Sequence, residues 1–204
     1  MEPLTYPHTI YSESTPNPAS MKFVCNQLLW SGDPMEFFNP SECTHVPLAR
    51  KLFQFPFVKS LFISGNFITV NKSENIEWIE VVNEVRDHIQ SYLREGNPIV
   101  NPAVETNSSS KQPESVATNP SINSRENTEL EDKIVDALDQ YIRPGVESDG
   151  GAIQFKSFNK GMVTVTLRGA CSGCPSSTIT LKAGIESVLT RLIPEVKEVR
   201  AEEL

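Results

Sequence analysis

Residues 163–189 have the sequence VTVTLRGACSGCPSSTITLKAGIESVL, and the pattern changes once along it, at a pair of cysteines. Before the pair, Val163, Val165 and Leu167 alternate with polar residues, which predicts a strand with one buried face. After the pair, Pro175 begins a stretch whose apolar residues recur at helical spacing, which predicts a helix. The two cysteines are therefore expected in a turn that joins a strand to a helix.

The residues on either side extend this unit to an α-β-β-α-β order. Upstream, Thr128 and Glu131 form a capping box for a helix that residues 143–145, Arg-Pro-Gly, are expected to end. A hairpin partner precedes the strand described above, and a short last strand is expected over residues 196–200. We therefore expect residues 128–204 to form one small domain around a small mixed sheet.

Residues 1–96 predict another small domain of mixed composition. Residues 21–30 have the composition of a strand, and residues 58–71 are typical of a hairpin. Apolar residues at helical spacing predict a long helix over residues 74–95. The fold class expected for the whole chain is α+β, with two small domains.

Between these domains, residues 97–127 are rich in Asn, Ser and Pro and contain no aromatic residue. Such a segment buries too little apolar surface to offset the entropy lost on ordering. We therefore expect a flexible linker over residues 97–127.

The charge of the chain bears on its partners and its location. The net charge is -8, which disfavours binding to nucleic acid or to an anionic membrane surface, so proteins are the expected partners. No apolar run is long enough to span a bilayer. The first 18 residues have neither a basic region nor an apolar core, and from this we expect a cytoplasmic protein.

Cys171 and Cys174 are the candidate functional residues. In a reducing compartment, two cysteines at this spacing are more often metal ligands or catalytic thiols than a structural disulfide. A position near a helix N-terminus is expected to lower a thiol pKa, which favours metal binding. Gly169 and Gly173 would let the backbone approach a bulky inorganic cluster.

The number of ligands suggests how such a cluster would be held. Structural zinc and most iron-sulfur clusters take about four protein ligands. The second domain offers two cysteines, and no histidine occurs after His88. Two copies would supply four thiolates at a twofold interface, so we expect a homodimer bridged by a cluster. Such an exposed, shared site suits a carrier that gives up its cluster.

Two stretches of the second domain, IRPGVESDGGAIQF (142–155) and LRGACSGCPSSTITLKAGIE (167–186), resemble the NifU-like C-terminal domain. The stretch ESTPNPASMKF (13–23) is similar to the N-terminal domain of Nfu-type iron-sulfur scaffold proteins. The resemblance implies a non-enzymatic protein that binds a 4Fe-4S cluster through Cys171 and Cys174, with a 2Fe-2S form left open. It also implies upstream cluster assembly proteins as donors and apo iron-sulfur proteins as acceptors.

Other interpretations of the cysteines remain open from the residues alone. A C-x-x-C pair between a strand and a helix is also typical of a thiol-disulfide oxidoreductase, and two such pairs also suit a zinc-linked interaction protein. Cys25 lies in an expected strand, where a lone cysteine is usually a small buried apolar residue. Cys43 and His45 have no evident partner pair and are not assigned to a site.

Overall fold

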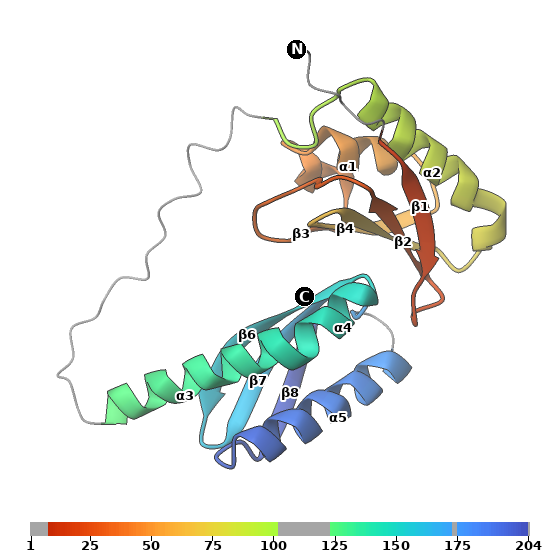
Figure 1. The fold of residues 1–204 in the computed structure, drawn as a ribbon. Coiled ribbons are helices and arrows are strands. Elements are labelled where there is room, and N and C mark those ends of the chain that lie inside the picture. Colours follow the sequence, from red (N-terminus) through yellow and green to blue (C-terminus); the bar gives the residue numbers. More distant parts are fainter. Residues whose placement is uncertain (1–7, 102–122, 173–174, 204) are drawn as a thin grey trace. The chain divides into compact units, whose positions relative to one another are not determined.

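The computed structural model of the protein describes residues 8–101, 123–172 and 175–203 (Figure 1). The chain has two compact units, which we define by their sheets: the first contains a five-stranded sheet and the second a three-stranded sheet. Both units contain helices and strands, so the predicted α+β class is confirmed. In the part of the chain that is described, no helix is long and apolar enough to cross a membrane.

The first unit is an antiparallel sheet with the strand order β1-β2-β5-β4-β3. Its strands are β1 (Ile10–Ser14), β2 (Ser20–Cys25), β3 (Met35–Phe37), β4 (Val58–Ser64) and β5 (Phe67–Lys72). The predicted hairpin is confirmed, because β4 and β5 pair around Gly65, whose φ of 53° suits a residue without a Cβ. The predicted strand over residues 21–30 is shorter than expected, since it ends at Cys25.

Three helices complete this unit: η1 (Pro40–Cys43), α1 (Pro47–Leu52) and α2 (Trp78–Arg94). Alternate residues of the central strands, including Phe23, Ile63 and Ile68, point to one side and are fully buried there. Val85 and Ile89 of α2 belong to the same core. Each such side chain contributes about 1.5–3 kcal/mol when fully buried, so this layer of apolar contacts stabilises the unit.

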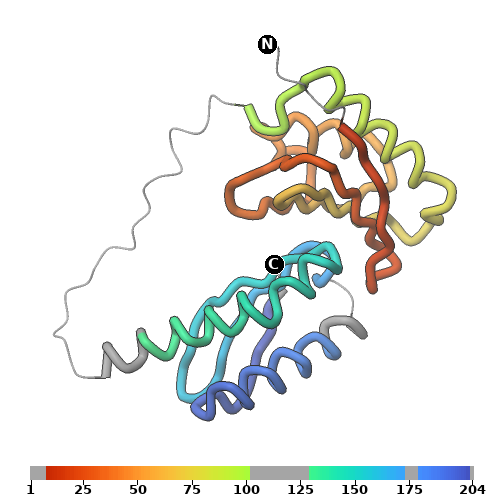
Figure 2. The backbone as a smooth tube through the Cα atoms, in the orientation of Figure 1, coloured from red at the N-terminus to blue at the C-terminus, as the bar shows by residue number. Residues whose placement is uncertain are grey.

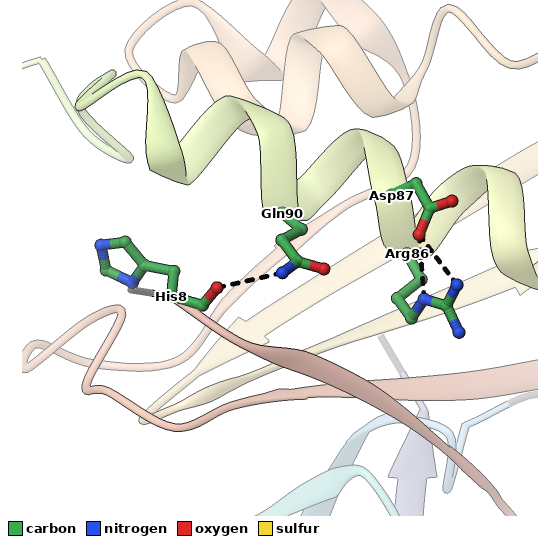
Figure 3. A network of polar contacts seen from close by, with 4 residues as sticks. All are labelled: His8, Arg86, Asp87 and Gln90. Carbon is green, nitrogen blue, oxygen red and sulfur yellow. Dashed lines mark hydrogen bonds and ion pairs between the residues drawn. The ribbon is translucent and has the colours of Figure 1, made fainter. Parts of the chain in front are cut away.

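The helix α2 is also tied to the beginning of β1 by a polar contact. The side-chain amide of Gln90 donates a hydrogen bond to the backbone oxygen of His8, at 3.2 Å (Figure 3). One turn earlier, Arg86 and Asp87 form an ion pair at 2.9 Å, which lies on the surface and therefore adds little stability. The contact from Gln90 fixes the entry of the chain into its edge strand.

The first unit extends beyond the boundary predicted at residue 96. The hydroxyl of Tyr92 donates to the backbone oxygen of Pro98 at 2.8 Å, and the backbone nitrogen of Asn101 donates to His45 at 2.9 Å. Ile99 and Val100 pack against the core of the unit. Residues 97–101 are thus part of this unit, and most of the predicted linker, residues 102–122, lies outside the described residues.

The second unit contains α3 (Asn123–Ala137), η3 (Leu138–Ile142), α4 (Arg143–Ser148), β6 (Gly151–Asn159), β7 (Met162–Gly169), α5 (Pro175–Leu192) and β8 (Glu198–Glu203). Its sheet has the order β6-β7-β8. β6 and β7 are joined through a tight turn at Lys160 and Gly161, while β7 and β8 run parallel. The predicted small mixed sheet is therefore confirmed.

The first helix of this unit is longer than predicted at both ends. It begins at Asn123 rather than at a cap formed by Thr128, and Figure 2 shows one unbroken coil from α3 through η3 to α4. Pro144 does not end it, because the preceding segment is a π-helix in which the Arg143 nitrogen donates to the Leu138 oxygen, five residues back. The wider turn removes the need for the hydrogen bond that a proline cannot donate.

Both long helices contribute to a single core. Ile134 and Leu138 from the first helix, Ile185 and Leu189 from α5, and Val165 from β7 are buried to within 2% exposure. After the exposed Met162, the residues of β7 alternate between buried and half-buried, as the sequence pattern predicts for a strand with one covered face. This packing fixes the end of β7, from which the cysteine loop begins.

Candidate functional site

Cys171 lies in the turn between β7 and α5, as the sequence predicts. The strand ends two residues before it, at Gly169, and the helix begins at Pro175. Cys174 lies outside the described residues, so the structure places one of the two predicted ligands. The expectation that both sulfurs face one metal centre stays a prediction.

The backbone at Gly150 crosses the segment that leads to Cys171 at very short range. The backbone nitrogen of Ala170 donates to the oxygen of Gly150 at 3.2 Å, and a Cβ on Gly169 would lie 2.7 Å from that same oxygen. Gly150 and Gly169 also have positive φ values, of 80° and 70°, which side chains disfavour. The turn at residues 149–151 thus packs directly against the segment that carries Cys171.

Gly151 lies directly against the sulfur of Cys171. A Cβ on Gly151 would lie 2.7 Å from Cys171 Sγ and 2.7 Å from the backbone oxygen of Arg168. Its φ is not positive, so the glycine is required by the neighbouring sulfur and backbone rather than by its own conformation. The second glycine of the Gly150-Gly151 pair was the available signal, since a turn of this kind needs one.

The electrostatic environment of Cys171 differs from the prediction. Burial, with a smaller contribution from the nearby carboxylate of Asp149, raises the pKa of its thiol to about 12. A helix N-terminus was expected to lower this pKa. In the metal-free chain the thiol therefore keeps its proton at neutral pH, and binding a metal centre there has to release it.

The other two cysteines lie in the first unit and are fully buried. Cys25 is in β2, where its sulfur is 3.7 Å from Nδ1 of His8, and Cys43 is in η1, where its thiol donates to the backbone oxygen of Asn39. Within the described ranges, no group of three or more His, Cys, Asp or Glu side chains is placed to hold a metal ion. The burial of Cys25 agrees with its interpretation as a core residue.

Comparison with known proteins identifies the family. Residues 10–96 match the model for the N-terminal domain of the scaffold proteins Nfu and NifU, and residues 134–200 match the model for the NifU-like domain. The chain is 36% identical over 191 residues to a human protein named NFU1 iron-sulfur cluster scaffold homolog, mitochondrial, and the match covers 93% of this chain and 70% of the human protein. The chain belongs to the Nfu family of iron-sulfur cluster scaffold proteins.

Further members of the Nfu family and a solved structure are similar to this chain. A Drosophila sechellia protein with the same name is 36% identical, and the match covers 93% of this chain and 63% of the fly protein. The solution NMR structure of a NifU-like protein from Saccharomyces cerevisiae aligns with 50% of this chain and 92% of its own, at a TM-score of 0.43 and 25% identity.

The expectation of a cytoplasmic protein is wrong. The relatives from human and from several Drosophila species are named as mitochondrial proteins. The expectation rested on the composition of the first 18 residues, and the rest of the fold carries no signal for the compartment. The scaffold family is thus established for this chain, whereas its cluster type and ligands are matters for proposal.

Proposed function

We propose that this protein carries a 4Fe-4S cluster as cargo, bound by Cys171 and Cys174 from each of two copies, and delivers it to apo-proteins. The observation that carries the proposal is the position of Cys171. Its sulfur lies against Gly151, at a point where the turn before β6 leaves no room for a side chain. A sulfur held in this way is a preorganised ligand, because the turn beside it restricts where its side chain can lie.

The composition of the second unit supports sharing between two copies. It contains two cysteines and no histidine, whereas a 4Fe-4S cluster takes about four thiolates. Cys25 and Cys43 belong to the hydrophobic core of the first unit, in β2 and η1, and are not part of the turn that carries Cys171. A second copy of Cys171 and Cys174 completes the set with the fewest additional assumptions.

Sharing also accounts for release. Each copy contributes half of the thiolates, so an acceptor with cysteines of its own can replace them stepwise by ligand exchange. The protein binds and hands on its cargo without turning over a small substrate, and its partners are a cluster donor upstream and apo iron-sulfur proteins downstream. The names of its relatives, which are called mitochondrial proteins, support mitochondria as the compartment of this activity.

Anaerobic reconstitution tests the proposal. The wild-type chain, Cys171→Ser, Cys174→Ser and the control Cys25→Ala are supplied with iron and sulfide, and iron, sulfide and native mass are measured on one sample. We expect about four irons per dimer in the wild type and in the control, and no cluster in either serine variant. Each loaded sample is then mixed with an apo-ferredoxin, whose recovered absorbance measures transfer.

Two other outcomes would contradict the proposal. Tight, colourless zinc bound at one ion per two chains would instead support the zinc-linked interaction protein. Turnover of a disulfide substrate that depends on both cysteines, without a cluster, would support the thiol-disulfide oxidoreductase. Iron uptake that is unchanged in Cys171→Ser would remove the ligand assignment altogether.

A further inference from the structure

Helix α1, the C-terminal turns of α2 and the segment after α2 surround a pocket in the first unit. It has a volume of about 600 Å³, within the range of roughly 300–1,000 Å³ that is typical of small-molecule sites. Its lining includes Lys51 of α1, His88 of α2, Glu95 at the C-cap of α2, and Asn97 and Pro98 of the following segment. None of these residues has a part in the site proposed above.

The wall formed by the segment after α2 is fixed to the helix by hydrogen bonds. The hydroxyl of the buried Tyr92 donates to the backbone oxygen of Pro98 at 2.8 Å. The side-chain amide of Asn97 donates to the backbone oxygen of Tyr92 at 3.2 Å and to Oε2 of Glu95 at 2.9 Å. The shape of the pocket is therefore set before a ligand arrives, which reduces the entropy lost on binding.

Two opposite charges line this pocket without pairing with each other. Burial and the ammonium of Lys51 lower the pKa of His88, whereas the carboxylates of Glu84 and Glu95 act in the opposite direction, so both kinds of charge act on one imidazole. No ion pair joins Lys51 to Glu95 in the part of the chain that the structure describes. The pocket thus presents a cation and an anion beside an uncharged histidine.

His88 gives a second indication that a polar molecule occupies the pocket. Its ring packs edge-on against Phe55, with 5.3 Å between the ring centroids, and its Nε2 is enclosed without a hydrogen-bond partner among the described residues. An enclosed polar atom without a partner is unfavourable, and an apolar side chain would pack against Phe55 without that cost. A polar occupant accounts for an imidazole at this position better than packing does.

We propose that this pocket binds a short zwitterionic peptide, with its carboxylate toward Lys51 and its ammonium toward Glu95. A ligand that carries both charges satisfies both side chains at once. A simple anion would instead meet Glu84, Glu95 and the negative end of the α2 dipole, and a simple cation would meet Lys51. The volume exceeds that of a single amino acid, which favours a peptide of a few residues. The inference goes beyond the proposed cluster function and does not depend on it.

Triglycine and two blocked forms of it test the inference. The full metal-free chain is titrated with triglycine, with its N-acetylated form, which has no ammonium, and with its C-terminal amide, which has no carboxylate. The ring signals of the three histidines are followed by NMR. Triglycine should shift the signal of His88, which is identified by its loss in His88→Gln, and leave that of His8 unchanged. Blocking either terminus should weaken binding about fivefold, as expected for the loss of one exposed charge pair.

Variants of the two charged side chains then test which terminus each one holds. Lys51→Gln should weaken triglycine about fivefold but bind the amide as the wild type does, because the carboxylate no longer has a partner. Glu95→Gln should show the same pattern with the acetylated peptide. Lys59→Gln and Glu80→Gln remove exposed charges of the same unit outside the pocket lining, and both should bind triglycine like the wild type.

Three outcomes would overturn the inference. The first is that millimolar triglycine leaves the His88 signal in place. The second is that the blocked peptides bind as tightly as triglycine. The third is that Lys59→Gln weakens binding as much as Lys51→Gln, since the effect would then come from net charge. Tryptophan fluorescence verifies that each variant is folded. Iron binding should be unchanged in Lys51→Gln and Glu95→Gln, so failure of the cluster proposal and failure of this inference are measured separately.

Discussion

The substitution Gly151→Ala tests whether the turn before β6 holds the sulfur of Cys171 in place. The added Cβ would lie 2.7 Å from Cys171 Sγ and from the oxygen of Arg168, and 3.1 Å from Cys171 Cβ. Ordinary contact begins at 3.4 Å, so these groups would have to separate by about 0.7 Å. The Arg168 oxygen belongs to β7, which is paired with β8, so the cysteine side chain is the group most free to move.

The expected cost follows from overpacking, which typically destabilises a core by about 1–3 kcal/mol. For a domain of this size, each 1 kcal/mol shifts the unfolding midpoint by about 4–8 °C, so a decrease of roughly 4–24 °C is expected. Hydrogen exchange of the β7 amides measures this locally. Trp30 and Trp78 both lie in the first unit, so their fluorescence should report an unchanged transition there.

Gly184→Ala is the matched control, since it makes the same chemical change where, among the described residues, a Cβ would point into open space. It should stabilise the metal-free second unit by up to about 1 kcal/mol, because alanine favours a helix interior. Iron content after reconstitution is then measured for both variants at a temperature where both are folded. A Gly151→Ala protein that loses stability yet keeps the iron content of the wild type would show that the glycine serves packing alone. Unchanged stability would refute the steric argument itself.

Two predictions concern the first unit. Burial, followed by the charge of Glu42, raises the pKa of Cys43 to about 11 from an ordinary value of 9.0. The unfolded thiol therefore loses its proton at a lower pH than the folded thiol, so the free energy of unfolding of this unit should decrease as pH rises from about 9 to 11. Urea titrations followed by tryptophan fluorescence measure this decrease, and Cys43→Ala should weaken it. Tyr92→Phe removes the 2.8 Å hydrogen bond to the backbone oxygen of Pro98 and should destabilise this contact by about 0.5–1.5 kcal/mol. Hydrogen exchange and proteolysis at residues 97–101 should then be faster than in the wild type. Equal rates in both proteins would show that the bond does not hold this segment.

Much of the fold could be predicted because local periodicity and burial agree. The hairpin of β4 and β5, the long helix α2, the strand β7 and the helix α5 each bury one face, and the sequence shows that face directly. The missed elements are short. β1, β3 and α1 have three to six residues, too few to establish a period, and depend on neighbours distant in sequence for their stability.

The errors at the helix ends have a different cause. Pro144 was expected to end a helix, since a proline cannot donate the usual hydrogen bond. The structure instead widens the preceding turn to a π-helix, and no local sequence rule indicates that choice. Residues 97–101 were assigned to the linker by composition, but Tyr92 and the core hold them through contacts that composition does not encode.

The position of Cys171 was predictable, whereas its environment was not. The order strand, turn and helix placed the residue, because each part has a local signal. The raised pKa and the contact with Gly151 depend on a turn some twenty residues away in sequence, and a single sequence does not show which turn approaches which thiol. The second glycine of the pair Gly150-Gly151 was the one indication in the sequence that this turn approaches another part of the chain closely.

A cargo shared between two copies also responds to concentration in a way that a cargo held by one chain does not. Binding that requires a second chain follows mass action, so the occupied form gains stability as the chain concentration rises and loses it on dilution. Dissociation on dilution is consistent with release, because a strong interface would keep the two chains together after an acceptor had begun to displace their thiolates.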